Sequence, residues 1–418
     1  MRNPRLIFTS VLTVLIFTVF AGVLYYRTHS NDGEALLDDP IDELPPSPTR
    51  MGVFKKAAIV TNADVCGPIG GNILKRGGKA VDAIIAAALC DGVVFPQNTG
   101  LGGGFLMTYY DKKEKKVYSV NSRESAPAAA TETMFHGDKD IAQRGGLSIA
   151  IPSELKGFWT IYNRFGGGIE WKELFNETIS LCRKGIPITR YLQNSLKRYT
   201  TLLEKFPAIK ELYTNPDTGK LFVEGEFMKR PKLADTMEVF QKEGGDALYT
   251  GSLVKDFVAD LRKEGSIITA ADLANYRVEI EETPIKVNLK DDLTLYSINL
   301  PGAGPVIAHV LSLLNDLLPS QDLNADFVKM VEAFKFGYAR RSEFGDPKFV
   351  NNDKVLNSMT DPDNIKRIQK EIETMQTSQD PTFYGANFTT VADHGTANLA
   401  VIAENGDAAV LTSTVNLQ

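Results

Sequence analysis

The spacing of apolar residues changes along the chain and divides it into stretches of different structure. Residues 6–26 are uncharged and largely apolar, which predicts a membrane-spanning helix because about 20 such residues cross the hydrocarbon core. Residues 56–62 and the alternating runs on both sides of the charged stretch 111–116 predict strands. Residues 80–94 are apolar on nearly every helical face, which predicts a buried helix.

Helical periodicity dominates the middle of the chain, from residue 152 to about residue 375. Amphipathic runs there predict helices at residues 153–165, 171–184, 230–242, 253–263, 305–318 and 326–341. Alternation returns after residue 396, where two runs flank Asn405-Gly406, a dipeptide typical of a tight hairpin turn. The order of strands, helices and strands predicts one α/β domain whose sheets collect both ends of the chain.

Charges beside the first apolar stretch predict its orientation. Arg2 and Arg5 precede it and an acidic run follows Arg27, so residues 1–5 are expected in the cytoplasm and the remainder outside. A cleaved signal peptide is the alternative, but the run is long and no A-x-A site closes it, which favours an uncleaved signal anchor. Residues 27–52 are acidic and proline-rich, as in a stalk. We therefore expect a single-pass type II protein of the plasma membrane.

An extracellular location would allow glycosylation of asparagines and disulfide bonds between cysteines. Asn176 and Asn387 each begin an N-x-[ST] sequence, so both are candidate glycosylation sites. Cys66 and Cys90 bracket a segment short enough to be closed by a disulfide, which would leave Cys182 as a free, buried thiol. No Cys or His spacing matches a zinc site, and we expect neither a metal nor a cofactor.

Composition narrows the class of protein. The 418 residues include 46 Lys and Arg against 52 Asp and Glu, a net charge of −6 without a basic run, so nucleic acid is excluded as a partner. A hydrophobic content of 43% allows a large core. The glycines of residues 98–110 lack the GK[ST] ending of a phosphate loop, and we interpret them as close backbone packing into the following strand.

The C-terminal hairpin brings a polar cluster back beside Thr396. A two-residue turn would place Val415 opposite Thr396. A loop one residue longer, with a bulge at Gly406, would place Asn416 opposite Thr396 and Thr414 diagonally on the same face. Both registers predict hydroxyl and amide groups next to the threonine that begins the strand.

Thr396, preceded by Gly395, fits the chemistry of an N-terminal nucleophile. Cleavage of the peptide bond between them would give Thr396 an α-amine of pKa about 7.7–8.0, which can act as a base toward its own hydroxyl. Gly395 can take the strained geometry that brings this hydroxyl onto its carbonyl. Taken alone, the stretch is also compatible with an ordinary turn into a strand.

The same residues carry a resemblance to a known family. DHGTANLAVIAENGDAAVLTSTVNL resembles the processing and nucleophile segment of the γ-glutamyltransferases (glutathione hydrolases), and NTGLGGGFLM, NSRESAP, IAIPSELKGF and RRSEFGDPKFV extend the likeness from about residue 55 onward. The resemblance implies a four-layer αββα N-terminal-nucleophile hydrolase fold, made as one precursor that cuts itself before Thr396. Residues 53–395 would then be the large-subunit part and residues 396–418 the start of the small subunit.

The resemblance also assigns binding residues. A γ-glutamyl group carries an α-carboxylate, which a planar arginine can bind through two hydrogen bonds. Arg123 matches the family's carboxylate-binding arginine, although on sequence alone it is equally a solvated strand-end residue paired with Glu124. Thr414 matches the threonine that supports the nucleophile, and Asn416 the asparagine that contacts the glutamyl group, which favours the bulged register.

The implied activity is hydrolysis and transfer of the γ-glutamyl group of glutathione and related γ-glutamyl amides, with water, an amino acid or a dipeptide as acceptor. Cys66 and Cys90 match a disulfide pair of animal members. In the family, a longer small subunit supplies acidic residues for the substrate ammonium, a serine pair and a Gly-Gly oxyanion hole. The sequence stops at Gln418 before any of these, so we expect an incomplete fold and an inactive chain, since one lost oxyanion donor costs about 10²–10³ in rate. The alternative is a non-catalytic, membrane-anchored relative with an interaction role or none.

Overall fold

The computed structural model describes residues 51–374, 376–387 and 395–417. The chain divides into two units, Met1–Val53 and Phe54–Gln418, and every helix and strand named below belongs to the second. The expected membrane helix at residues 6–26 and nearly all of the expected stalk lie outside the described residues, so both stay predictions. Within the described ranges, no helix combines the length and the apolar character needed to cross a bilayer.

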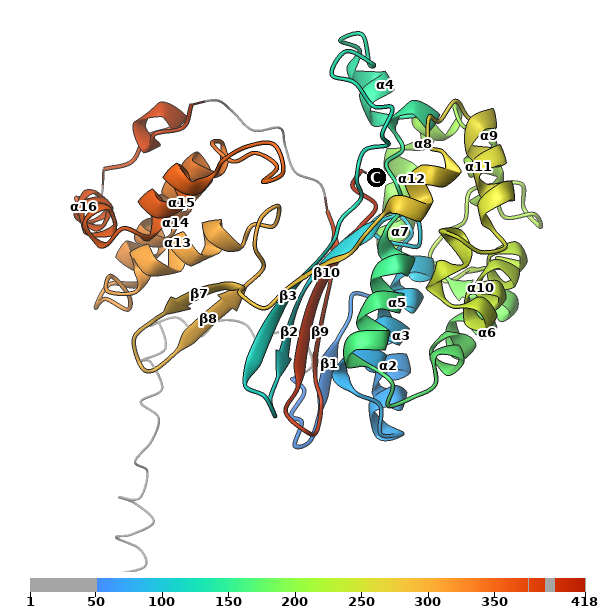
Figure 1. The fold of residues 1–418 in the computed structure, drawn as a ribbon, viewed down its shortest axis with the longest axis horizontal. Coiled ribbons are helices and arrows are strands. Elements are labelled where there is room, and N and C mark those ends of the chain that lie inside the picture. Colours follow the sequence, from blue (N-terminus) through green and yellow to red (C-terminus); the bar gives the residue numbers. More distant parts are fainter. Residues whose placement is uncertain (1–50, 375, 388–394, 418) are drawn as a thin grey trace, which may run out of the picture. The chain divides into compact units, whose positions relative to one another are not determined.

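A six-stranded antiparallel sheet contains both ends of the second unit (Figure 1). Across the sheet the strands are β1 (Ala58–Val60), β9 (Ala397–Ile402), β10 (Ala408–Thr414), β2 (Gly104–Asp111), β3 (Lys116–Ser122) and β6 (Glu279–Glu281). The prediction that strands from the two ends of the domain meet in one sheet is confirmed for the described residues. In chain order, the last two described strands of this sheet, β9 and β10, therefore lie between the first two, β1 and β2.

One face of this sheet is covered by three helices, α2 (Cys66–Lys75), α3 (Ala80–Val94) and α5 (Glu154–Phe165) (Figure 1). The bounds of α3 match the predicted helix, and all but one of its residues are buried, as its uniform apolar pattern requires. Side chains at alternate positions of the strands, such as Phe105 and Leu399, point into this layer and form the main core.

Further helices pack around this layer. They are α4 (Lys139–Gln143), α6 (Asn176–Lys184), α7 (Arg190–Arg198), α8 (Thr200–Leu203), α9 (Pro207–Leu212), α10 (Pro231–Glu243), α11 (Val254–Lys263) and α12 (Ala270–Asn275). The same region contains 3-10 turns at Gly146–Ser148, Trp171–Phe175 and Gly245–Leu248. It also contains a two-stranded ribbon of β4 (Ile186–Pro187) and β5 (Phe227–Met228). The helix predicted at residues 171–184 is thus a 3-10 turn followed by α6.

A second helical group has its own core. It comprises α13 (Gly304–Leu314), α14 (Leu323–Arg341), α15 (Asp353–Thr360), α16 (Pro362–Glu373), the 3-10 turn Pro381–Tyr384, and the hairpin of β7 (Ile285–Asn288) and β8 (Thr294–Ser297). Strands β6 to β8 fall inside the stretch predicted to be mostly helical, which was wrong there. Each has only three or four residues, and half-exposed strands of that length leave too little alternation to detect.

The other face of the large sheet and one side of α14 expose large apolar side chains. On the sheet these are Val60, Val410 and Ile402, which are more than half exposed. On α14, exposed apolar residues recur every three or four positions, at Phe327, Val331, Phe334 and Tyr338. The described residues contain one large sheet, and no second sheet of comparable size occurs among them.

Candidate active site

Thr396 immediately precedes β9 and faces the last residue of β10. The pairs of this hairpin end with Ala397 opposite Ser413, so Thr414 lies opposite Thr396. Both registers considered from the sequence, with Val415 or Asn416 opposite Thr396, are therefore wrong.

The loop explains this register. Ala403 donates its N–H to the Asp407 carbonyl at 2.9 Å, and the Gly406 N–H donates to the Ala403 carbonyl at 2.9 Å. Gly406 takes a φ of +86°, as in a three-residue loop with a glycine bulge. The bulge was expected correctly, but the extra loop residue is Glu404, on the β9 side, which shifts the pairing in the opposite direction.

Arg123 belongs to the same end of the sheet. Thr414 pairs with Gly104, and the pairing of Phe105 with Ser122 puts Arg123 next to Gly104 in register. Thr396, Thr414, Gly104 and Arg123 therefore form a row across four strands. Since neighbouring strands lie about 4.8 Å apart, the backbones of Thr396 and Arg123 are separated by about 14 Å.

Arg123, at one end of this row, lines a cavity on the outward face of the sheet, whereas Thr396, Thr414 and Gly104 are not among the residues that line it. The Thr412 hydroxyl donates to the Asn398 side-chain oxygen at 2.8 Å, so these two residues share that face, and alternation puts Thr396 and Thr414 on it as well. A cavity of about 720 Å³ is lined by Arg123, by Thr412 and by the segment that enters α13. The cavity is large enough for a small peptide-like ligand.

Arg123 is held in two ways. Its backbone carbonyl accepts a hydrogen bond from the Tyr276 hydroxyl at 2.9 Å, and its N–H donates to the Asn121 side chain at 3.1 Å. Its Nε lies 3.3 Å from a Glu124 carboxylate oxygen, with the arginine side chain 31% exposed. Burial raises the pKa of Glu124, and the neighbouring Arg123 partly opposes that effect. Arg123 therefore pairs with Glu124 and lines the cavity at the same time.

Thr414 and Asn416 are coupled by a turn. Thr414 is 4% exposed, and its hydroxyl oxygen accepts a hydrogen bond from the Asn416 N–H at 2.9 Å. Asn416 is exposed and has a φ of +75°. This left-handed conformation turns the chain away from the strand direction directly after β10.

A polar network that was not predicted from the sequence lies behind β9. The Asn98 side-chain amide donates to the Thr396 carbonyl at 3.1 Å. The Thr99 and Ser413 hydroxyls are hydrogen-bonded to each other, and Ser413 donates to the fully buried Glu154 carboxylate at 3.1 Å. Burial raises the pKa of Glu154 well above its usual value, and the Ser413 hydrogen bond opposes this. The sequence feature that could have revealed this network is the polar pair Asn98 and Thr99, directly before the glycine run.

The glycine run has the packing role that was expected. A side chain on Gly103 would collide with the Thr414 carbonyl oxygen, and one on Gly104 would collide with the Ser153 hydroxyl and the Ser122 carbonyl. These glycines let β10 and the start of α5 approach β2 closely.

The remaining candidate residues lie away from the cavity. Cys66 and Cys90 are joined by a disulfide. Cys182 is free and buried, and burial raises the pKa of its thiol to about 11. Asn176 and Asn387 are both exposed, and their glycosylation stays a prediction.

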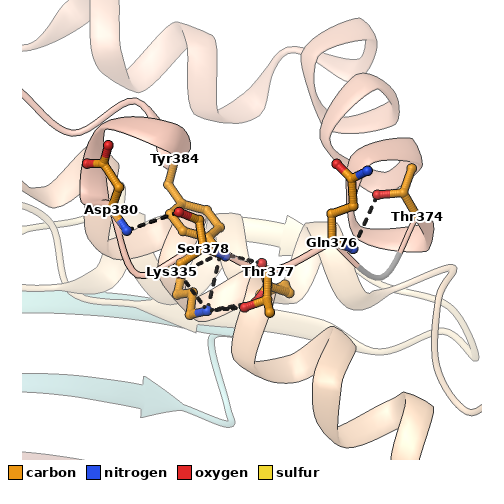
Figure 2. Close-up of polar contacts among 8 residues, drawn as sticks. Lys335, Thr374, Gln376, Thr377, Ser378, Asp380 and Tyr384 are labelled. Carbon is orange, nitrogen blue, oxygen red and sulfur yellow. Dashed lines mark hydrogen bonds and ion pairs between the residues drawn. The ribbon is translucent and has the colours of Figure 1, made fainter.

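The segment Thr377–Tyr384, which precedes Thr396 in the chain, is anchored on α14. Figure 2 shows Lys335 beside Thr377, Ser378 and Tyr384, with hydrogen bonds of 2.6 to 3.2 Å. The buried Glu332 accepts a hydrogen bond from the Thr377 hydroxyl and forms an ion pair with Lys335 at 2.8 Å. The predicted cleavage point follows this anchor, although residues 388–394 lie outside the described residues.

Comparison with known proteins identifies the family. The gamma-glutamyltranspeptidase family model matches residues 66–418, and the chain belongs to that family. It is 36% identical to scoloptoxin SSD14 of Scolopendra dehaani, over 90% of this chain and 66% of that protein. It is 31% identical to glutathione hydrolase 3 of Arabidopsis thaliana, over 84% of this chain and 55% of that protein.

Solved structures agree with this assignment. The gamma-glutamyltranspeptidase from Pseudomonas nitroreducens, complexed with L-DON, has a TM-score of 0.70 and 26% identity, over 80% of this chain and 99% of that chain. The Helicobacter pylori gamma-glutamyltranspeptidase has a TM-score of 0.71 at 22% identity, over 82% of this chain and 99% of that chain. The chain therefore has the α/β fold of the N-terminal-nucleophile hydrolases. It spans between 55% and 66% of the length of the curated relatives cited above.

Proposed function

We propose that this chain carries the nucleophile and the carboxylate-binding residue of an enzyme that hydrolyses and transfers the γ-glutamyl group of glutathione and related γ-glutamyl amides. The observation that carries the proposal is the row of Thr396, Thr414, Gly104 and Arg123 at one end of the sheet. The family match and the name of the Arabidopsis relative, a glutathione hydrolase, support the substrate class.

Self-cleavage is the first step of the proposed chemistry. The Thr396 hydroxyl attacks the Gly395 carbonyl carbon, the Gly395–Thr396 C–N bond breaks, and the hydroxyl proton passes to the departing nitrogen. Water then hydrolyses the resulting ester, leaving a carboxylate on Gly395 and a free amine on Thr396. The amine supplies the base that turnover requires, without histidine or aspartate.

Turnover uses the same hydroxyl. The Thr396 amine takes the hydroxyl proton while Oγ1 attacks the γ-amide carbon, and the proton then goes to the departing amine as the C–N bond breaks. Water or an amino-acid or dipeptide acceptor releases the γ-glutamyl group from the ester. Arg123 binds the α-carboxylate of the γ-glutamyl group across the row, a span that the arginine side chain and a five-carbon glutamyl group can share. Thr414 supports the nucleophile, and Asn416 contacts the glutamyl group.

The finer architecture is part of the same proposal. Residues 6–26 anchor the protein in the plasma membrane, residues 27–52 form the stalk, and residues 53–395 and 396–418 belong to the large and small subunits of one extracellular precursor. The exposed apolar faces of the sheet and of α14 support a four-layer αββα arrangement, because large apolar areas are normally covered.

The test is direct. The chain is expressed and its fragments are sequenced from the N-terminus, and release of a chromogenic amine from a γ-glutamyl amide is measured. Where the natural coding sequence continues past Gln418, the continued form is assayed in parallel. In the continued form we expect a fragment that begins at Thr396 and amine release that depends on it, with both abolished in Thr396→Ala, whereas we expect the chain that stops at Gln418 to release no amine. Fragments with another N-terminus, or full turnover by Thr396→Ala, would exclude Thr396 as the nucleophile. Intact precursor without turnover in both forms would favour the non-catalytic relative.

A further inference from the structure

We propose that Asn98 is the positioning residue of the nucleophile, because its side-chain amide fixes the Thr396 carbonyl. The inference rests on the proposed function and deepens it. The supporting geometry is the hydrogen bond of 3.1 Å from Asn98 Nδ2 to the Thr396 carbonyl oxygen, between residues 298 positions apart.

The backbone of Asn98 is itself rigidly held. Its N–H donates to the Phe95 carbonyl at 2.9 Å, and its carbonyl accepts from the Val415 N–H at 3.0 Å. Asn98 thus links the chain just before β9 to the chain just after β10, and it is only 6% exposed. Its neighbour Thr99 is hydrogen-bonded to Ser413, so the support comes from two consecutive residues.

The hydrogen bond from Asn98 matters because a newly formed N-terminal residue is joined to the chain on its carbonyl side alone. Once the Gly395–Thr396 bond is broken, ψ is the only backbone torsion that still orients the Thr396 amine and side chain relative to the sheet. The hydrogen bond to the carbonyl holds the peptide plane, and with it the Cα–C bond about which the amine and the side chain turn. One torsion then remains between the sheet and the amine and hydroxyl of Thr396, and restraint of this kind is worth large factors in rate.

Asn98 Oδ1 is buried without a hydrogen-bond partner in the described part of the chain. A buried acceptor without a donor is unfavourable in the precursor. The ammonium form of a newly freed α-amine is a donor of the kind that this atom lacks.

Two substitutions of Asn98 distinguish the loss of its hydrogen-bond donor from the effect of an added negative charge. Asn98→Ala removes the donor and the unpartnered acceptor together. Asn98→Asp keeps the shape, but an ionised carboxylate can only accept, and its charge stabilises a nearby ammonium. The matched control is Asn163→Asp on the exposed surface of α5, where the amide also donates to a backbone carbonyl, that of Trp159 at 2.8 Å.

We expect Asn98→Ala to slow self-cleavage and to lower kcat by about 10- to 100-fold, with KM within about threefold of the parent, because Arg123 and the cavity are untouched. Asn98→Asp should also move the acid limb of the kcat/KM profile to higher pH by roughly one pH unit, because the amine must be deprotonated to act as base. A purely structural role would not move that limb. Asn163→Asp should match the parent in all three measurements.

The outcomes distinguish this inference from the function on which it rests. Thermal unfolding sets an assay temperature at which each variant is folded, and Asn98→Ala, which buries no charge, provides the test if Asn98→Asp does not fold. Parent-like cleavage, kcat and pH profile in folded Asn98 variants, with Thr396→Ala inactive, would overturn the inference and leave the function standing. A parent that never yields an N-terminus at Thr396 would overturn both.

Discussion

The hydroxyl of Tyr384 donates a hydrogen bond of 2.6 Å to the buried carboxylate of Glu332, 52 residues earlier in the chain. Lys335 lies over the Tyr384 ring, 5.2 Å from its centroid (Figure 2). Burial acts to raise the pKa of Glu332, but hydrogen bonds from Lys335, Tyr384 and Thr377 outweigh it and hold the pKa below its usual value. The cluster therefore stabilises the folded state while the carboxylate is ionised.

Tyr384→Phe should lower the free energy of unfolding by about 1.5–3 kcal/mol at neutral pH, because a charged buried acceptor loses its donor. A depressed carboxyl pKa contributes stability above its unfolded value, and that contribution is lost as the pH falls through the folded value. Urea unfolding of parent and variant should thus converge below about pH 4. The exposed Tyr338→Phe on the same helix serves as control, with a change within about 0.5 kcal/mol. Equal losses in the two variants would contradict the role of the cluster.

Arg123→Lys should raise KM for γ-glutamyl substrates by about 10- to 100-fold, since an ammonium cannot bind a carboxylate through two parallel hydrogen bonds. The loss should disappear with an analogue that lacks the α-carboxylate. Steady-state kinetics with the substrate pair checks this, and Arg144→Lys on the surface is the control. An Arg123→Lys variant that penalises both substrates equally would show that Arg123 acts on structure and not on the carboxylate.

Gly103→Ala should destabilise the protein by about 2–4 kcal/mol, because the new methyl group would overlap the Thr414 carbonyl. The neighbouring Gly102→Ala meets no atom within 4 Å and should change stability by no more than about 0.5 kcal/mol. Thermal or urea unfolding of the two variants makes the comparison. Similar values for both would mean that β10 does not approach the glycine run as described.

Asp91 predicts a pH dependence of stability. This fully buried carboxyl accepts hydrogen bonds from the backbone N–H groups of Asn62 and Ala63, and burial raises its pKa from 3.8 to about 6 despite these bonds. A raised carboxyl pKa means that stability is fully present below the unfolded value and declines as the pH rises through the folded value. Urea unfolding should show Asp91→Asn gaining about 2–3 kcal/mol on the parent between pH 4 and pH 7. If the free energies of unfolding of the parent and Asp91→Asn changed in parallel with pH, Asp91 would not be the source of the pH dependence.

The sequence predicted the features that depend on long, continuous patterns. Helix α3 was found to the residue because its apolar run is long and uniform. The central hairpin was found from its dipeptide, but its register depends on whether the extra loop residue joins β9 or β10, and no pattern reports that.

The family resemblance named Arg123 and Thr396; the structure puts both at the same end of the sheet, and their roles stay predictions. Asn98 was missed because its partner lies 298 residues away. A single amide side chain in a loop does not by itself indicate a functional site. Strands β6 to β8 were missed because they are too short to show a period.

The strand order has a consequence for synthesis on the ribosome. Among the described strands, β1 pairs only with β9, and β2 gains its second neighbour from β10. More than 300 residues must therefore emerge while the centre of the sheet is still missing, and the edges of β1 and β2 stay open to unwanted partners during that time. The sheet cannot close before β9 and β10 have been translated, so we expect nascent chains to depend on chaperones until both strands have left the exit tunnel.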